Sequence, residues 1–424
     1  RMEIPYVLRL TRRSLTPTIA GILVSMGYSF LQERPRRNGH GRTLPQAQCV
    51  PAMTQPRAIP WCKGRLSTDM EKLKARRIFL EEDAEAAFED AYGKGWTDGL
   101  PIIPPTSARV ERMMATVERA PDSVVATLPP RNGVATVERI AANAVMAGCR
   151  PDYLPVVVAA VEAIAQPEFN LYGINSTTSP VTPMLIVNGP VRHMIDLNGS
   201  YGFFGPGWRA NATIGRAIRL VQLNIGGSIP GSVSKSTMAQ PGRYSMCMAE
   251  YEERSPWPPL HVEMGHPAEE STVTVTAATS TVSVSDVWSR DAEGILVTMT
   301  SSMDWPGIPS LRYFSGRPLL ILNPDHAAVC SHDGLSKEDV KRVLHERTSH
   351  IPLSRFAKAE QERLTEDRRV HDGHVAMVPG PEYFMVVVAG GHGGFHSTFV
   401  PTWAQSQPVT RVIDTRRITP ASGS

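Results

Sequence analysis

The sequence predicts an α/β protein in which a mixed sheet is flanked by helices. Segments with helical periodicity alternate with short apolar runs of branched residues, which is typical of helices packed on a sheet. Residues 271–300 alternate apolar and polar side chains with period two, which indicates strands. With 424 residues, 42% hydrophobic and 20% charged, the chain has the composition of a globular protein and the length for a large core.

The first 69 residues differ from the rest in composition. They contain ten arginines against three acidic residues, and one apolar run, 19–30, that is too short to span a bilayer. Arg12 and Arg13 precede this run as in a twin-arginine export signal, but no small-residue cleavage site follows. We therefore expect residues 1–69 to be disordered or an upstream extension translated in error, with the native start at Met70.

The remaining elements follow from periodicity and from glycine and proline. The segment 95–106, "GWTDGLPIIPPT", has three prolines and is expected to form a rigid extended arm. Gly148 is the expected left-handed end of a helix, and Ser336 with Asp339 forms a capping box. The expected elements are helices over 70–93, 108–118, 136–146 and 152–165; a buried strand over 181–190; a helix over 213–224; strands within 271–300; a strand and a helix within 317–330; a helix over 336–347; and a strand from 382 that runs into a glycine-rich end.

No internal repeat is evident in the sequence. We divide the chain after the extension into 70–260, a helix-rich α/β substrate-binding domain, and 261–424, an α/β domain with the glycine-rich strand end.

The loop and helix start in "FFGPGWRANATIGRAIRL" (203–220) is the first candidate site. Gly205 and Gly207 permit positive φ angles, and Asn211 is a candidate helix cap. Unpaired N–H groups with Arg209 and Arg216 beside them would favour a carboxylate or phosphate. The alternative is a tight loop whose arginines pair with acidic neighbours.

Two other loops are candidates for substrate contact. Asn175, Ser176, Thr177 and Thr178 come directly before a predicted strand, and such a run either binds a polar substrate or forms a capped turn. Gly390 and Gly391 lie at a strand end, where ligands approach the backbone in α/β folds.

His392 lies in this glycine-rich end, four residues before His396. On a helix that spacing would suit a metal ion, but three of the five residues 391–395 are glycines. A helix is therefore not expected there, and we predict no metal site. His392 is predicted as a proton carrier.

The cysteines bear on compartment and on catalysis. Five cysteines without a CxxC pair predict free thiols in a reducing, cytoplasmic compartment. Cys149 is predicted in an elbow between two helices next to Arg150, and Cys247 precedes a run of glutamates; either is a candidate nucleophile or redox thiol. Buried structural cysteine is the alternative for both.

The charge distribution argues against large charged partners. The net charge is +3, and from Met70 onward the chain is slightly acidic. We therefore expect neither nucleic-acid nor membrane binding, and a homo-oligomer stays open.

Four stretches, 95–106, 143–163, 204–217 and 336–356, resemble a poorly characterised bacterial family. That family is found beside, or fused to, a small domain named for a Sec-Gly-Ser-Cys motif, the UGSC-type selenoproteins. The resemblance covers residues 80–415, but the chain lacks "CGSC" or a comparable motif, which puts an autonomous thiol redox activity in doubt. The resemblance implies a catalytic or substrate-binding unit that works with a thiol or selenol partner, and it supplies no substrate, cofactor or catalytic residue.

The sequence thus supports two hypotheses. The first is an enzyme for a small anionic or acyl substrate, with Arg209 holding the anion, Cys149 or Cys247 as the thiol and His392 moving the proton, in thiol-linked redox or lyase chemistry. The second is a non-catalytic subunit that binds such a substrate for a thiol- or selenol-dependent partner. The first requires Arg209, Asn175, Cys149 and His392 to share one pocket.

Overall fold

Two four-stranded mixed sheets form the centre of the computed structural model, which describes residues 73–74, 83–313, 316–367 and 369–418. The first sheet has the order β13–β5–β3–β4, and the second has the order β11–β7–β12–β6. The strands of the first sheet are β3 (Thr182–Asn188), β4 (Cys247–Ala249), β5 (Thr272–Ala278) and β13 (Val409–Val412). Those of the second are β6 (Val282–Ser285), β7 (Leu319–Leu322), β11 (Met385–Val388) and β12 (His396–Val400). The predicted class, a mixed α/β fold, is confirmed. The expectation for residues 1–69 lies outside the described residues.

The two sheets repeat one pattern of strand directions. Strand β4 is parallel to β3, and β5 and β13 follow antiparallel on the other side. Likewise β11 is parallel to β7, and β12 and β6 follow antiparallel. The structure therefore contains a duplication of topology that the sequence does not reveal.

The fourth strands are exchanged between the sheets. Strand β6 follows β5 in the chain but pairs with β12 in the second sheet, and β13 follows β12 but pairs with β5 in the first. The two crossing segments bind each other, because the N–H and the hydroxyl of Thr279 donate to the carbonyl of Pro401 at 2.9 and 2.8 Å. The first sheet is therefore built from both predicted parts: β3 and β4 come from 70–260, and β5 and β13 come from 261–424.

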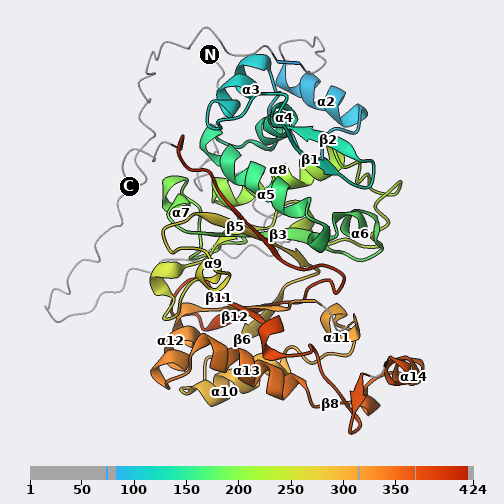
Figure 1. Cartoon of the computed structure of the whole chain (residues 1–424), viewed down its shortest axis with the longest axis vertical. Helices are drawn as coiled ribbons and strands as arrows, with labels where there is room; N and C mark the ends of the chain where they lie inside the picture. The colour runs from blue at the N-terminus through green and yellow to red at the C-terminus, as the bar shows by residue number, and fades with distance from the viewer. Residues whose placement is uncertain (1–72, 75–82, 314–315, 368, 419–424) are drawn as a thin grey trace, which may run out of the picture. The chain divides into compact units, whose positions relative to one another are not determined.

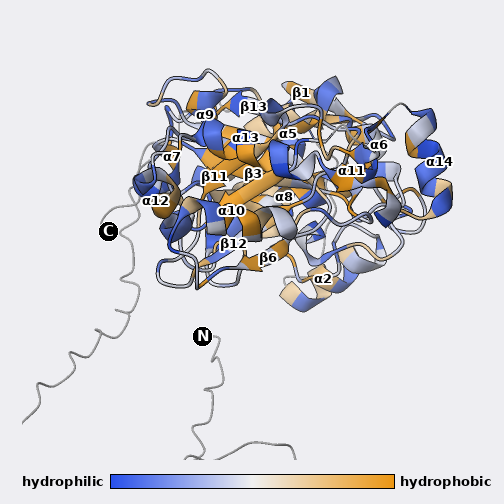
Figure 2. Cartoon of the chain, turned by 90° about the horizontal axis from the view of Figure 1, so that it is seen from below, coloured by the Kyte–Doolittle hydropathy of each residue, from blue (hydrophilic) through white to orange (hydrophobic). Residues whose placement is uncertain are grey.

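Helices cover the outer faces of the two sheets, as Figure 1 shows. Helices α5 and α8 pack on the first sheet and α4 packs on α5 and α8, whereas α10, α12 and α13 pack on the second sheet. The central strands β3, β7 and β11 are hydrophobic (Figure 2) and buried throughout. In β3, Leu185 and Val187 pack with the helices, whereas Met184 and Ile186 pack with the other sheet. Such near-continuous apolar strands are expected where both faces are buried.

The helices and the smaller strands have the following bounds. The helices are α2 (Ala84–Gly93), α3 (Ser107–Met114), α4 (Val137–Ala147), α5 (Leu154–Ile164), α6 (Leu171–Ser176), α7 (Val191–Met194), α8 (Arg209–Asn224), α9 (Leu260–Glu263), α10 (Ala292–Ser301), α11 (Pro309–Tyr313), α12 (Pro324–His332), α13 (Lys337–Thr348) and α14 (Lys358–Glu366). Strands β1 (Val124–Leu128) and β2 (Gly133–Thr136) form a hairpin, and β8 (Ile351–Pro352), β10 (His374–Val375) and β9 (Val370–His371) form a small sheet. No helix in the described part of the chain is long and apolar enough to cross a bilayer.

One predicted segment has the wrong secondary structure. Residues 292–300 lie in the segment 271–300 that the sequence predicts as strands, but they belong to α10. The carboxylate of Asp291 accepts the N–H of Gly294 at 2.8 Å and caps the helix. Ile295, Leu296 and Met299 are buried at helical spacing, so packing on the second sheet decides the conformation over the local alternation.

Candidate functional site

The loop before α8 leads to a helix start without a side-chain cap. Gly202 and Gly207 have φ angles of 66° and 113°, which glycine adopts without steric cost. Trp208, the N-cap residue, is extended and makes no capping side-chain hydrogen bond. The first N–H groups of α8 therefore donate no hydrogen bond to the N-cap side chain, and the helix dipole favours negative charge beside them.

A hollow of about 230 Å³ lies at this helix start, and we call it the α8 hollow. Two phenyl rings with centroids 4.5 Å apart form part of its wall, so one part is apolar while another lies by the first turn of the helix. Its lining residues are Phe203, Phe204, Gly205, Pro206, Asn211, Ala212, Ser245 and Cys247. A small molecule with an apolar portion and an anionic end matches this arrangement.

Asn211 holds the hollow together rather than capping the helix. Its side chain is 3% exposed. The amide nitrogen donates to the carbonyls of Asn198, Phe203 and Cys247, and the amide oxygen accepts the N–H of Asn198. Because both ends of the amide are committed to the backbone, Asn211 positions the loop and β4 around the hollow.

The two arginines predicted to hold an anion have other partners. Arg209 donates from Nε and Nη2 to the carbonyl of Gly148, at 3.1 and 2.9 Å, and so caps the end of α4. Arg216 forms a two-pronged ion pair with Asp98 of the extended arm, with both contacts at 2.8 Å. Burial alone would raise the pKa of Asp98, but the bonds and charge of Arg216 outweigh it and lower that pKa. The alternative, a loop whose arginines pair with acidic neighbours, describes Arg216, whereas Arg209 binds a backbone carbonyl.

The thiols lie close to the hollow but are buried. Cys247 is on its wall, and the Sγ of Cys149 donates to the carbonyl of Thr213 at 3.3 Å. Burial raises the pKa of Cys149 to about 12 and also raises the pKa of Cys247 well above its ordinary value. Both thiols are therefore protonated at neutral pH, and the described residues that line the hollow include no histidine or carboxylate to activate them.

The Ser/Thr run lies elsewhere. Asn175 is 1% exposed, its amide donates to the carbonyl of Pro129 at 2.8 Å, and its own carbonyl accepts the hydroxyl of Ser228 beyond the end of α8. The hydroxyl of Ser176 donates to the carbonyl of Tyr172 in its own helix. Twelve residues of α8, about 18 Å, separate Ala212 on the wall of the hollow from Asn224 at this end of the helix.

The rest of that run is likewise used by turns. The hydroxyl of Thr177 accepts the N–H of Ser179 at 3.1 Å, and the carbonyl of Thr178 accepts the N–H of Thr237 at 3.1 Å. A capped turn accounts for these contacts.

The glycine-rich end does meet the loop before α8. The N–H of Gly390 donates to the carbonyl of Gly199 at 2.8 Å, and a Cβ on Gly391 would lie 2.0 Å from the ring of Tyr201. Phe203, which lines the hollow, would be 3.8 Å from a Cβ on Gly390. Gly390, Gly391 and His392 are not among the residues that line the hollow.

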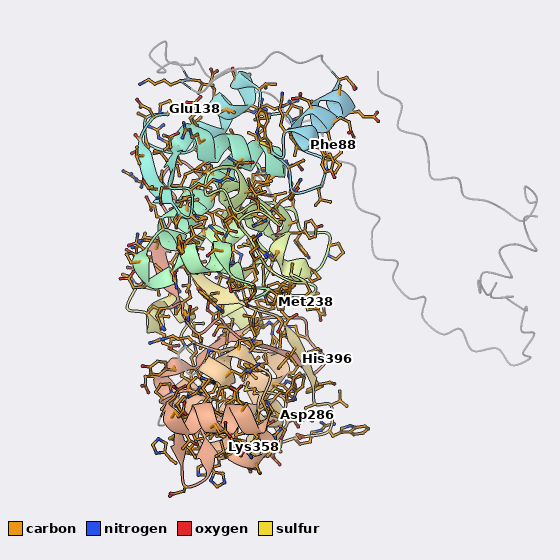
Figure 3. All side chains as sticks on the ribbon, turned by 90° about the vertical axis from the view of Figure 1, so that its right-hand side faces the viewer. Phe88, Glu138, Met238, Asp286, Lys358 and His396 are labelled. Atoms are coloured by element: carbon orange, nitrogen blue, oxygen red, sulfur yellow. The ribbon has the colours of Figure 1, made fainter. Side chains whose placement is uncertain are left out.

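His392 lies between two aromatic rings. Its ring centroid is 5.9 Å from that of Tyr251 and 6.4 Å from that of Tyr201, and Nδ1 is 3.7 Å from a carboxylate oxygen of Asp325. Nε2 is buried and has no hydrogen-bond partner among the described residues. His396, labelled in Figure 3, begins β12 and pairs with Ser285 of β6, so the two histidines do not share a helix face. In the described residues no group of three or more His, Cys, Asp or Glu side chains is placed to hold a metal ion.

A buried charged network at the end of β4 was missed by sequence reasoning. Glu250 is 0% exposed; one carboxylate oxygen accepts the amide of Asn188 and the N–H of Leu260 at 2.7 and 2.8 Å. Burial raises the pKa of Glu250, and the charge of Lys337 offsets part of that effect. The sequence signal for this network is the run of glutamates directly after a short apolar strand.

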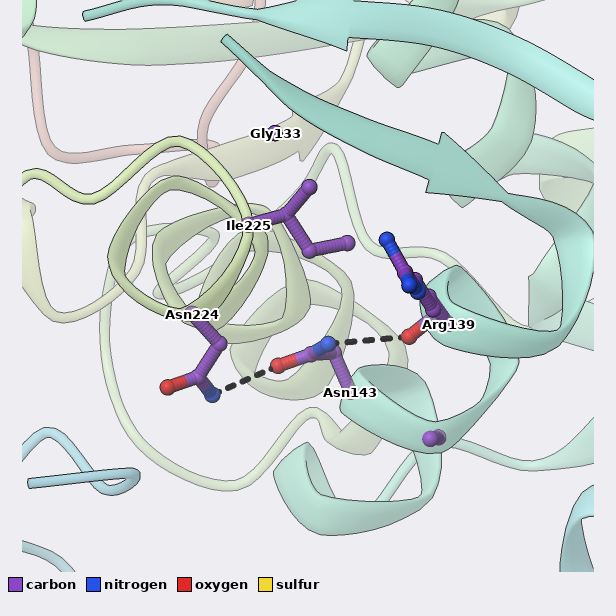
Figure 4. Close-up of a pocket in the computed structure, with 6 residues that line it drawn as sticks. Gly133, Arg139, Asn143, Asn224 and Ile225 are labelled. Carbon is purple, nitrogen blue, oxygen red and sulfur yellow. Dashed lines mark hydrogen bonds between the residues drawn. The ribbon is translucent and has the colours of Figure 1, made fainter. Parts of the chain in front are cut away.

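A second hollow, of about 260 Å³, lies at the other end of α8 (Figure 4). The amide of Asn224 donates to Asn143 at 2.7 Å, and that of Asn143 donates to the carbonyl of Arg139 at 2.9 Å. These amides satisfy one another, and none of the predicted site residues lies in this hollow. We therefore take the α8 hollow as the candidate site.

The sequence matches no protein-family model and no curated protein.

Proposed function

We propose that this protein binds a small anionic or acyl molecule in the α8 hollow and presents it to a thiol- or selenol-dependent partner. The observation that carries the proposal is a hollow with two phenyl rings on its wall beside an uncapped helix start. The helix amides and dipole would hold the anionic end, and the rings of Phe203 and Phe204 would contact the apolar part. The partner rests on the resemblance to the UGSC-associated family, and the free Cys149, Cys247 and Cys330 support a reducing, cytoplasmic setting.

Binding without thiol catalysis fits the surroundings of the cysteines. A nucleophilic thiol must lose its proton, whereas burial raises the pKa of Cys149 and of Cys247. The four side chains required for the enzyme hypothesis do not share the hollow: Asn175 lies near the far end of α8, and His392 lies on the glycine-rich end. These placements favour a substrate-binding subunit.

Acid–base catalysis by His392 is the second candidate function. It is favoured by one observation, the unpartnered Nε2 of a histidine whose Nδ1 faces Asp325. A substrate that reached this nitrogen could exchange a proton with it.

A charge placed in the hollow tests the proposed function. Ala212 is exposed and lines the hollow on the first turn of α8. Ala212→Glu adds a carboxylate that suits the helix start but repels an anionic ligand and fills its space. We expect acetate, butyrate, phosphate or an acetyl thioester to bind the wild type in isothermal titration calorimetry, and the affinity for that probe to fall by at least about tenfold in the variant.

The matched control is Ala84→Glu, which adds the same side chain to the exposed first turn of α2. It should keep wild-type affinity. Failure of the wild type to bind any of these probes, or equal affinity in Ala212→Glu, would contradict the proposal.

A further inference from the structure

Two histidines from different segments of the chain lie together at the small sheet β8–β10–β9. His350 lies between the end of α13 and β8, and His374 begins β10. The two ring centroids are 5.9 Å apart, and the ring planes are inclined by 52°. Strand β8 pairs with β10, with Pro352 opposite His374, and His350 comes directly before β8, so this strand pairing brings the two histidines together.

Both rings are oriented by backbone carbonyls. Nδ1 of His350 is 3.1 Å from the carbonyl oxygen of Glu346, and Nδ1 of His374 is 2.8 Å from that of Asp372. A carbonyl oxygen only accepts, so each Nδ1 must carry a proton. In the neutral ring Nε2 then has a lone pair, which is the state in which histidine binds metals when its other nitrogen donates to a carbonyl.

The spacing of the rings suits a shared metal ion. Two imidazoles bound to one zinc ion at about 2.1 Å have ring centres about 5 to 6 Å apart, and the observed 5.9 Å lies in that range. His350 is exposed and His374 is half-buried, so water can reach the site and complete the coordination.

We propose that His350 and His374 form a two-imidazole site for a divalent transition metal such as Zn²⁺ or Ni²⁺. The metal would join the β9–β10 hairpin to the end of α13, which are otherwise linked by the short strand β8. This site is independent of the α8 hollow. No local sequence pattern marks this pair, because His350 and His374 lie in different segments of the chain.

Nickel titration of the full chain tests this site. We expect wild-type protein to bind one Ni²⁺ more than His350→Ala or His374→Ala, or to bind it at least about tenfold more tightly. The comparison between variants removes the contribution of the other histidines and of the cysteines. Thermal melts without metal check that each variant is folded.

His371→Ala is the matched control. His371 is exposed, lies opposite His374 in the same hairpin, and is not part of the proposed pair. Its replacement should leave nickel binding within about threefold of wild type, well below the tenfold effects expected at a ligand. Equal binding by wild type and both pair variants would overturn the proposal, and so would a loss in His371→Ala as large as that in His374→Ala.

Discussion

The two sheets share one strand pattern but differ at the carboxyl ends of their parallel pairs. In the first sheet these ends carry Asn188 and Glu250, which are buried in a network of charges. In the second they carry Asn323 and Gly390, and the side chain of Asn323 donates to a backbone carbonyl of the glycine-rich end. The carboxyl ends of the parallel strands therefore lie beside ion pairs in the first sheet and beside exposed backbone and a histidine in the second. Topology sets where a site can form, and the residues at the strand ends decide what forms there.

Among the variants that test this difference between the two halves, removal of the Arg192 charge should lower the free energy of unfolding most. Arg192 is 6% exposed, and it pairs with Glu252 and Glu253 and donates to the carbonyl of Glu250. Arg192→Met leaves these groups without their cation and should lower the free energy of unfolding by about 3–5 kcal/mol, measured by urea denaturation. Arg290→Met, at an exposed position near the second sheet, should change it by less than about 0.5 kcal/mol. Similar values for the two variants would show that the network does not stabilise the first half.

Lowering the pH should reveal how much stability comes from a carboxylate beside the second sheet that neutral donors stabilise. Asp286 follows β6, and burial alone would raise its pKa. Bonds from Ser289, Thr298 and Trp288 outweigh burial and lower that pKa to about 2. Because the folded-state pKa is depressed, the stabilisation is complete above the unfolded value of about 3.9 and is lost as pH falls through about 2.

The measurement for Asp286 is stability against pH. Between pH 5 and pH 2 the wild type should lose roughly 2 kcal/mol more than Asp286→Asn, by chemical denaturation at each pH. Added salt should change this difference little, since neutral donors hold the carboxylate. Parallel curves for the two proteins would contradict this account.

The smallest effect is expected at the glycine-rich end. A Cβ on Gly391 would overlap the ring of Tyr201, which is 62% exposed and can turn outward. Gly391→Ala should lower the free energy of unfolding by about 1 kcal/mol, and much less in a Tyr201→Ala background. Gly394→Ala, where the nearest atom would be 3.7 Å away, is the control. If Gly391→Ala lowered the free energy of unfolding equally in the Tyr201→Ala background, contact with the Tyr201 ring would not be the cause.

Local patterns predicted the elements whose signals lie within a few residues. The capping box of Ser336 and Asp339 and the left-handed Gly148 both occur as expected. The start of α8 was placed four residues late, because Asn211 and Thr213 resemble caps while the actual N-cap is Trp208, which has no capping side chain. Pairing between distant segments leaves no such local mark, so neither the repeated strand pattern nor the exchange of strands could be read from the sequence.

The candidate site was predictable in part for the same reason. The glycines and helix start at 203–220 are local, and the hollow lies there. The partners of the two arginines are not local in the sequence. Only folding brings Gly148 to Arg209 and Asp98 to Arg216. Polar residues in a loop indicate bonding capacity without showing whether backbone, side chain or ligand uses it.

The exchange of β6 and β13 has a consequence for synthesis. The first sheet receives its edge strand from residues 409–412, more than a hundred residues after β5 has left the ribosome. Until then one side of β5 offers unpaired N–H and C=O groups, which favour association with other chains. Strands β12 and β13 thus complete the two sheets almost together. A nascent chain should therefore be prone to aggregate until β13 has emerged, and so should a chain truncated before Val409.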